Sequence, residues 1–224
     1  MAMAPAPRRV LAALLAHPAA KPILFLLALL PFSWLLYGAA TNQLGANPAE
    51  HLIRATGDWT LRFLCITLAV TPLRVITGTP TLARFRRMLG LFVYFYVVLH
   101  LLSYSWFDMG FDVPDIAKDI AKRPFILVGF TGFLLLTPLA ASSFNRAVKA
   151  MGARRWQALH KLVYVIAGLA LLHFFWMRAG KRNFAEVAVY AAIIALLLGW
   201  RLVQYSKKKW PESSKRAYRA LSKQ

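Results

Sequence analysis

The sequence predicts an all-α integral membrane protein, a bundle of about six transmembrane helices with both termini in the cytoplasm. Of its 224 residues, 59% are hydrophobic, and the mean hydropathy is +0.51, which is more apolar than an ordinary soluble domain. The apolar residues gather in runs of roughly 17–22, the length a helix needs to cross a bilayer. The net charge of +20 lies between these runs, which favours basic loops facing anionic lipid over nucleic-acid binding.

Hydropathy divides the chain into a cytoplasmic lead at residues 1–21, a six-helix domain at 22–204 and a basic cytoplasmic tail at 205–224. The lead carries Arg8 and Arg9 and resembles a signal-peptide start, but the apolar run after it is long for a signal segment, so we expect a retained first helix. The predicted spans are about 22–40, 58–76, 87–106, 124–142, 157–177 and 184–204.

Charge predicts the orientation of these spans. With the N-terminus in the cytoplasm, the inner side holds 20 of the 28 Lys and Arg residues, as the positive-inside rule requires. Four of the acids fall between residues 108 and 119 without metal-site spacing, so we expect a solvated loop there that faces a partner. The outer side then holds seven of the eight acids: Glu50, Asp58, Asp108, Asp112, Asp115, Asp119 and Glu186.

Three of the five histidines fall at membrane depth, where ionisable side chains are costly and tend to mark function. His100 lies in the third span, and His160 and His173 lie in the fifth. Both spans run outward, and His173 comes about 20 Å beyond His160 at 1.5 Å per residue, so His100 and His173 should share a depth in the outer half. Two imidazoles at one depth on neighbouring helices are what a bis-histidine b-type haem requires.

The same histidines also fit simpler roles, because each ring could hydrogen-bond a helix backbone or serve a proton relay. The single cysteine, Cys65, rules out a C-x-x-C-H motif, so any haem is held without covalent attachment. Arg86 could pair with haem propionates or lie opposite His160. Because thirteen residues turn an ideal helix to about 140° from its starting direction, His160 and His173 do not share one face.

The cytoplasmic mouth of the fifth span carries Arg154, Arg155 and Trp156. A phosphate-bearing flavin could dock on these cations with its ring near the tryptophan, although a basic loop with an interfacial tryptophan has the same pattern. No G-x-G-x-x-G motif occurs and the tail is short, so we expect no direct collection of electrons from a nicotinamide. We expect His17 and His51 to be ordinary surface residues.

Three segments carry a family resemblance: "NPAEHLIRATGDWTLRFLCITLAVTPLR", "RRMLGLFVYFYVVLH" and "RRWQALHKLVYVIAGLALLHFFW". Together they resemble the haem-binding membrane subunits of bacterial periplasmic methionine sulfoxide reductase systems, small relatives of the ferric reductase and NADPH oxidase transmembrane family. The resemblance covers about residues 45–178. It implies a cytochrome b of the bacterial inner membrane that passes electrons to a periplasmic molybdopterin subunit, which reduces methionine sulfoxide in oxidised proteins.

The same resemblance implies that His100, His160 and His173 are the candidate iron ligands, and that FMN and a cytoplasmic NAD(P)H flavin reductase deliver electrons. The larger relatives supply four histidines for two haems, and here Arg86 stands where the fourth would fall. We therefore expect one haem, on His100 and His173, with a second on His160 left open. The chain would then be an electron-transfer subunit rather than a catalytic one. The alternatives are a stand-alone ferric or small-acceptor reductase, and a proton-relay transporter or structural subunit.

Overall fold

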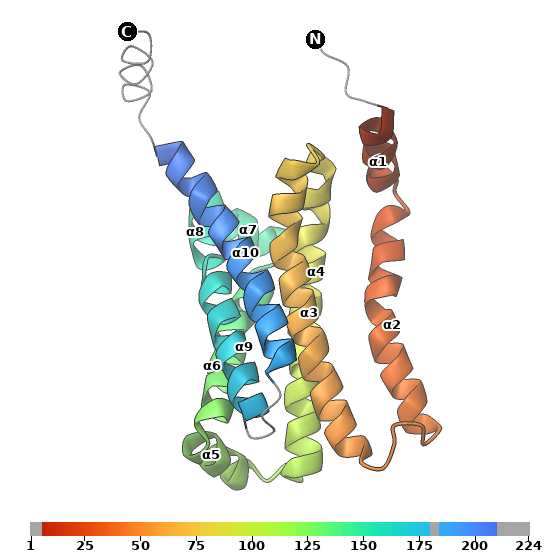
Figure 1. Cartoon of the computed structure of the whole chain (residues 1–224), viewed down its shortest axis with the longest axis vertical. Coiled ribbons are helices and arrows are strands. Elements are labelled where there is room, and N and C mark those ends of the chain that lie inside the picture. Colours follow the sequence, from red (N-terminus) through yellow and green to blue (C-terminus); the bar gives the residue numbers. More distant parts are fainter. Residues whose placement is uncertain (1–5, 180–183, 210–224) are drawn as a thin grey trace.

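The computed structural model describes residues 6–179 and 184–209 of the chain. Six helices in this part are long and apolar enough to cross a membrane, which confirms the predicted bundle and makes the chain a multi-pass membrane protein. They run alternately up and down in Figure 1. In chain order they are α2 (Ala20–Ala40), α3 (Pro48–Ile76), α4 (Arg86–Ser103, preceded by the 3₁₀ turn η1, Pro80–Phe85), α6 (Pro124–Ala141), α9 (Leu162–Ala179) and α10 (Ala185–Lys209).

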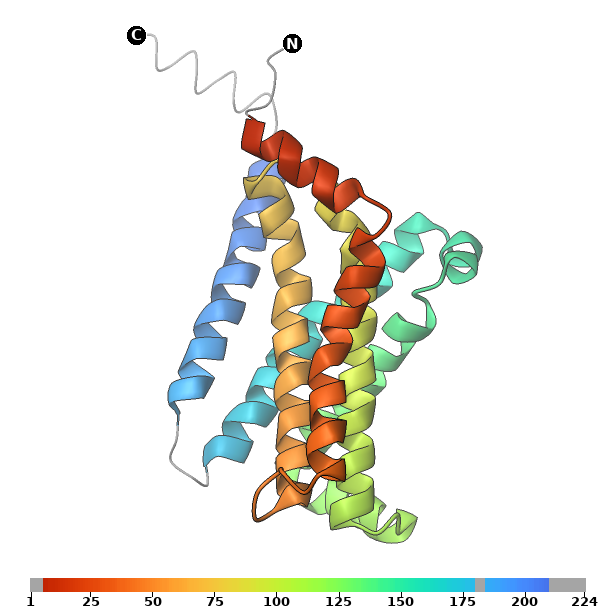
Figure 2. The same cartoon turned by 90° about the vertical axis from the view of Figure 1, so that its right-hand side faces the viewer.

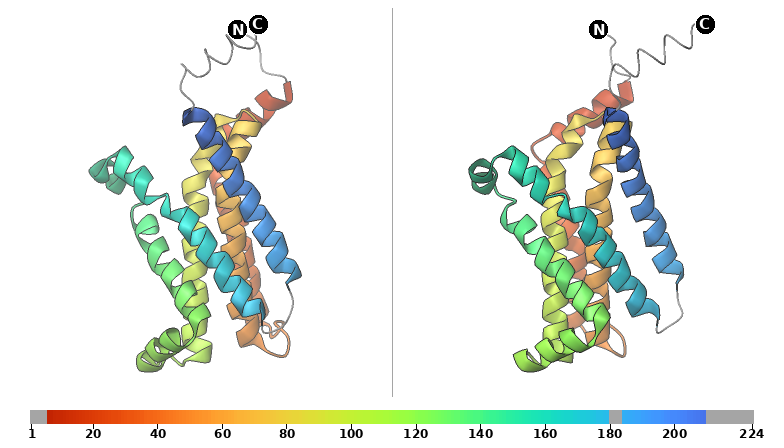
Figure 3. Two further views of the ribbon diagram at one scale, coloured as in Figure 1. Left: turned by 60° about the vertical axis from the view of Figure 1, so that its left-hand side comes forward. Right: turned by 90° about the vertical axis from the view of Figure 1, so that its left-hand side faces the viewer.

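The two ends of the bundle differ, and we name them by the short helices they carry. At the α1 end lie α1 (Ala6–Ala16), which is bent away from the axis of α2 (Figure 2), and the last turns of α10. Helices α7 (Asn145–Met151) and α8 (Ala153–Leu159) project sideways there (Figure 3). The opposite end is the α5 end. Helix α10 includes the first part of the predicted tail, and residues 210–224 lie outside the described residues.

The acidic segment that the sequence suggested as a solvated loop is instead structured. Helix α4 continues into a π-helical turn, η2 (Tyr104–Asp108), and α5 then forms at Val113–Lys122. The side chain of Asp112 accepts a backbone hydrogen bond at the start of α5, as N-cap aspartates do. The hydroxyl of Tyr104 donates to the Asp119 carboxylate over 2.8 Å. This bond fastens α5 to the end of α4.

Proline residues inside the spans free carbonyl groups that other helices then bind. Pro72 has no N–H to donate to the carbonyl of Leu68, four residues earlier in α3. The guanidinium of Arg201 in α10 donates to this carbonyl over 2.7 Å. A polar group at membrane depth is satisfied by a neighbouring helix, as proline-containing spans require.

The hydroxyl of Tyr96 is inserted into α2 beside Pro31. It accepts a hydrogen bond from the Phe32 N–H (3.1 Å) and donates to the Ala28 carbonyl (2.9 Å). The side chain is fully buried and its ring stacks on Phe63 at 5.2 Å. Tyr96 therefore joins α2 to the packed core between α3 and α4.

We expect Tyr96→Phe to destabilise the protein by about 1–3 kcal/mol, because the Phe32 N–H and the Ala28 carbonyl lose the hydroxyl that joins them to α4. The measurement is thermal unfolding in detergent, followed by circular dichroism. Tyr94→Phe is the matched control, because within the described residues its hydroxyl makes only a long contact with the Thr137 hydroxyl, at 3.5 Å. Equal melting temperatures for the two variants would contradict this role of Tyr96.

Candidate functional site

The structure brings His100 of α4 and His173 of α9 together in the half of the bundle nearer the α5 end. Their ring centroids lie 6.2 Å apart and the ring planes are inclined at 76°. The two residues are far apart in the sequence, because His100 lies in the third predicted span and His173 in the fifth. Their common depth is the one that helix direction and spacing predict.

Each of these two rings is held through its Nδ1 atom by a neighbouring helix. The Nδ1 of His100 donates to the carbonyl of Ile53 in α3 (2.8 Å), and the Nδ1 of His173 donates to the carbonyl of Phe125 in α6 (2.6 Å). A carbonyl oxygen has no proton to give, so Nδ1 carries the hydrogen and Nε2 of the neutral ring keeps its lone pair. Bonds of this kind orient histidines that bind metals. Both imidazoles are therefore prepared to act as ligands through Nε2.

A glycine makes room for each ring. Gly57 follows Ile53 by one helical turn, and a Cβ atom at Gly57 would lie 3.1 Å from the ring of His100. Gly129 follows Phe125 by one turn, and a Cβ atom there would lie only 2.7 Å from Nδ1 of His173. The two halves of the site thus repeat one arrangement, in which a histidine packs on a glycine and donates to the carbonyl one turn before it. The sequence analysis did not identify either glycine. A glycine inside an apolar helix was the signal that could have indicated close packing at these positions.

His100 and His173 line a cavity of about 360 Å³ that lies between α3, α4, α6 and α9. Most of its wall is apolar, including Leu61, Leu64, Val93, Val97, Phe130, Phe133, Leu136, Ile166 and Ala170. The charged side chains and the tyrosine that line the cavity belong to residues nearer the α5 end: Glu50, Arg54, Asp58, Tyr104, Asp108 and Arg123. This division suits a ligand with an apolar body and an anionic edge.

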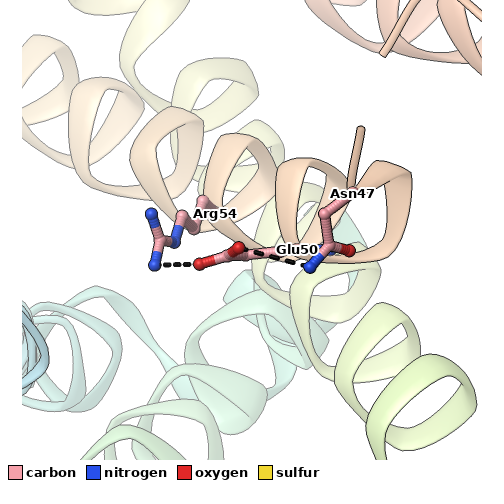
Figure 4. A network of polar contacts seen from close by, with 3 residues as sticks. All are labelled: Asn47, Glu50 and Arg54. Carbon is pink, nitrogen blue, oxygen red and sulfur yellow. Dashed lines mark hydrogen bonds and ion pairs between the residues drawn. The ribbon is translucent and has the colours of Figure 1, made fainter. Parts of the chain in front are cut away.

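Each of the two arginines in this polar group pairs with a carboxylate four residues earlier in the sequence. Arg54 pairs with Glu50, which also accepts a hydrogen bond from the amide of Asn47 at the start of α3 (Figure 4). Arg123 pairs with Asp119 at 2.8 Å. The guanidinium groups are therefore positioned in the cavity wall without being buried as unpaired charges.

His100 and His173 have the chemistry and the spacing that would hold a haem iron. A haem iron takes its other ligands from the macrocycle, so two imidazoles are the ligands that the protein needs to supply. Metal–imidazole bonds are about 2 Å long, which puts two imidazoles on opposite sides of one metal with centroids roughly 6 Å apart. The observed 6.2 Å separation matches this arrangement.

His160 lies elsewhere, at the end of α8. The fifth predicted span, 157–177, lies within the candidate membrane span Ala153–Ala179, and a turn at His160 and Lys161 interrupts the helix before α9 begins. The Nδ1 of His160 donates to the carbonyl of Trp156 (2.9 Å) and the two rings stack at 3.8 Å. Trp156 in turn donates to the Ser142 carbonyl at the end of α6 (2.9 Å), which fixes the direction of α8. The Nε2 of His160 is buried and has no hydrogen-bond partner among the described residues.

The remaining sequence candidates are at the α1 end or on the surface. Arg86 is exposed and donates to the Thr71 hydroxyl over 3.3 Å. It lies within electrostatic range of His160. It does not line the cavity of His100 and His173. The other candidates that are exposed are Arg154, Arg155, His17 and His51.

Comparisons with known proteins agree on one family. Residues 56–171 match the family described as Ferric reductase like transmembrane component. The chain is 81% identical to "Protein-methionine-sulfoxide reductase heme-binding subunit MsrQ" of Polaromonas naphthalenivorans over 84% of this chain and 86% of the relative. The MsrQ protein of Herminiimonas arsenicoxydans is 55% identical over 80% of this chain and 82% of the relative.

A further relative differs in size. The magnetosome protein MamZ of Magnetospirillum gryphiswaldense is 44% identical over 83% of this chain, but the match covers 29% of that protein. No solved structure matches the chain significantly. High identity over most of the length of both chains separates the MsrQ proteins from such larger relatives. The chain therefore belongs to the ferric reductase-like transmembrane family and, within it, to the MsrQ group.

Proposed function

We propose that the chain is a membrane cytochrome b, the electron-transfer subunit of a methionine sulfoxide reductase system in the bacterial inner membrane. The observation that carries the proposal is the pair His100 and His173, each fixed through Nδ1 and facing one apolar cavity. The relatives named as heme-binding subunits support it. We place the lead and tail in the cytoplasm, because the α1 end carries most of the basic residues.

Haem, when bound, supplies a reversible one-electron carrier. The Nε2 atoms of His100 and His173 would hold its iron, and the carbonyls of Ile53 and Phe125 keep both rings in the tautomer that could bind it. The apolar wall excludes water from the ring. In the described part of the chain, His160 has no second imidazole packed on it, as His100 has, and its stacking partner is Trp156. We therefore assign one haem to the chain.

Electrons enter at the α1 end and leave at the α5 end in this proposal. The donor is reduced flavin, FMN supplied by a cytoplasmic NAD(P)H flavin reductase, near the arginines at positions 86, 154 and 155 and the ring of Trp156. The acceptor is a periplasmic molybdopterin subunit that reduces methionine sulfoxide in oxidised proteins. The position of the histidine pair in the half of the bundle nearer the α5 end supports this exit.

The test is stopped-flow spectroscopy of the purified, haem-loaded chain with reduced FMN. We expect rapid reduction of the haem, and rapid reoxidation only after the catalytic subunit and a methionine sulfoxide substrate are added. Reoxidation by ferric citrate alone at the same rate would instead identify a stand-alone metal reductase. A preparation without haem, even after haem supplementation, would refute both.

Arg54 and Arg123 should bind the haem carboxylates, since they are the two cations that the described residues contribute to the cavity wall. Each cation favours the reduced, less positive iron. We expect Arg54→Gln and Arg123→Gln to lower the midpoint potential by roughly tens of millivolts each. Spectroelectrochemical titration measures this shift. Arg62→Gln is the control, because Arg62 does not line this cavity, and a shift equal to that of the control would exclude the role.

A further inference from the structure

Three helices bring arginines together at the α1 end of the bundle. Arg74 lies in the last turn of α3, Arg86 begins α4 and Arg201 lies in the second half of α10. Arg86 is within electrostatic range of both of the others. Like charges at such range repel one another, and the repulsion grows where water is displaced. We call these three residues the arginine cluster.

No carboxylate in the described part of the chain neutralises the cluster at this end. The acids of the described residues lie toward the α5 end of the bundle (Figure 1). They belong to the first half of α3, to the segment from η2 through α5, and to the first turn of α10. Charged groups at membrane depth normally pair with a partner of opposite sign. The acids concerned are Glu50, Asp58, Asp108, Asp112, Asp115, Asp119 and Glu186.

Arg201 is not a surface arginine that reaches into water. It is partly buried, its guanidinium lies over the Tyr164 ring at 5.1 Å, and one of its amino groups donates to the Leu68 carbonyl. Its Nε–H is buried and has no acceptor among the described residues. A buried donor without a partner costs about 1–3 kcal/mol. The local structure therefore contains a donor that an anionic oxygen would satisfy.

Two threonines of α3 add hydroxyl groups to the same region. Thr67, Thr71 and Arg74 are spaced at i, i+4 and i+7, so they share one face of the helix. Arg86 donates to the hydroxyl of Thr71. The hydroxyl of Thr67 is buried without a partner from the described part of the chain, and its methyl group faces Gly90, one turn after Arg86. Donors from α3, α4 and α10 thus converge on one side of the bundle.

We infer that the arginine cluster binds a phosphate group. Guanidinium groups pair with phosphate oxygens through several charge-assisted hydrogen bonds, and the negative charge of a phosphate offsets the mutual repulsion of the arginines. The phosphate has two possible sources, the monoester of FMN and the headgroup of an anionic phospholipid. The FMN source rests on the proposed function, and the lipid source does not.

The first experiment compares FMN with riboflavin, which lacks the phosphate, by fluorescence titration of the purified chain. We expect FMN to bind about tenfold or more tightly than riboflavin, with inorganic phosphate competing. Arg86→Gln and Arg201→Gln should remove this preference and leave riboflavin binding unchanged. Arg146→Gln, which changes an exposed arginine of α7 at the same end, should behave as wild type.

The second experiment identifies a lipid source by native mass spectrometry after exchange into mixed phosphatidylglycerol and phosphatidylcholine. If the lipid is the source, wild type retains phosphatidylglycerol, the Arg86 and Arg201 variants lose it, and FMN and riboflavin bind alike. Equal flavin affinities together with equal lipid retention in all variants would overturn the inference. The haem spectrum separates the two proposals, because it reports on the His100–His173 cavity even when no phosphate binds. It also shows that each variant is folded.

Discussion

Replacing His100 or His173 with alanine should lower haem affinity by more than about 100-fold, so that the purified variant carries less than about a tenth of the wild-type haem. Loss of an outer partner of a metal ligand already costs roughly 10–100-fold, and these changes remove the ligand itself. Each variant also leaves the backbone carbonyl that the ring had bound, Ile53 or Phe125, without its side-chain donor. Pyridine haemochrome analysis per mole of protein gives the occupancy.

His51→Ala is the control for these two variants, because His51 is exposed. His160→Ala answers a separate question. With one haem per chain, it should keep wild-type occupancy, since His160 stacks on Trp156 and not on the histidine pair. Halved occupancy in His160→Ala, from two haems to one, would show that a second haem exists. Full haem occupancy in His100→Ala or His173→Ala would contradict the proposal that these two histidines hold the haem together.

Gly129→Ala should lower haem affinity about 10–100-fold without any change to a ligand. The new Cβ atom would lie 2.7 Å from Nδ1 of His173, so the ring must move and lose its bond to the Phe125 carbonyl. Gly57→Ala should have a smaller effect, because its Cβ atom would lie 3.1 Å from His100. Competition for haem with apomyoglobin measures both affinities.

Gly168→Ala is the matched control for the glycine variants. It lies in α9, five residues before His173, and a Cβ atom there meets nothing within 4 Å among the described residues. Alanine should therefore raise helix stability by up to about 1 kcal/mol at this position and leave haem affinity unchanged. Equal haem binding by all three variants, or greater damage from Gly57→Ala than from Gly129→Ala, would show that the glycines do not position the rings.

The sequence was sufficient to predict the bundle and the histidine pair, because both follow from regular helix geometry. Apolar run length gives the spans, and because consecutive spans alternate in direction, the third and fifth run the same way and put His100 and His173 at one depth. The partners of these rings could not be predicted in this way. Ile53 and Phe125 are 47 and 48 residues away from their histidines, and only helix packing selects those carbonyls.

Two local differences from the sequence-based expectations have physical causes. The segment with α5 carries an N-cap signal, Asp112 followed by Pro114, which outweighs its acidic composition. The turn at His160 and Lys161 contains no proline or glycine that would predict it from the sequence. Beside this turn, Trp156 of α8 donates to the Ser142 carbonyl at the end of α6, which is a tertiary contact that sequence patterns do not predict.

Low-temperature electron paramagnetic resonance of the ferric, detergent-purified protein tests the central claim most directly. Two axial imidazoles keep haem iron low-spin, and ring planes inclined at 76° give the strongly anisotropic low-spin signal typical of near-perpendicular ligands. We expect that signal in wild type. A high-spin signal, or a preparation that takes up no haem, would contradict joint ligation of one haem iron by His100 and His173. A rhombic low-spin signal would contradict the ring orientations that the Ile53 and Phe125 carbonyls impose.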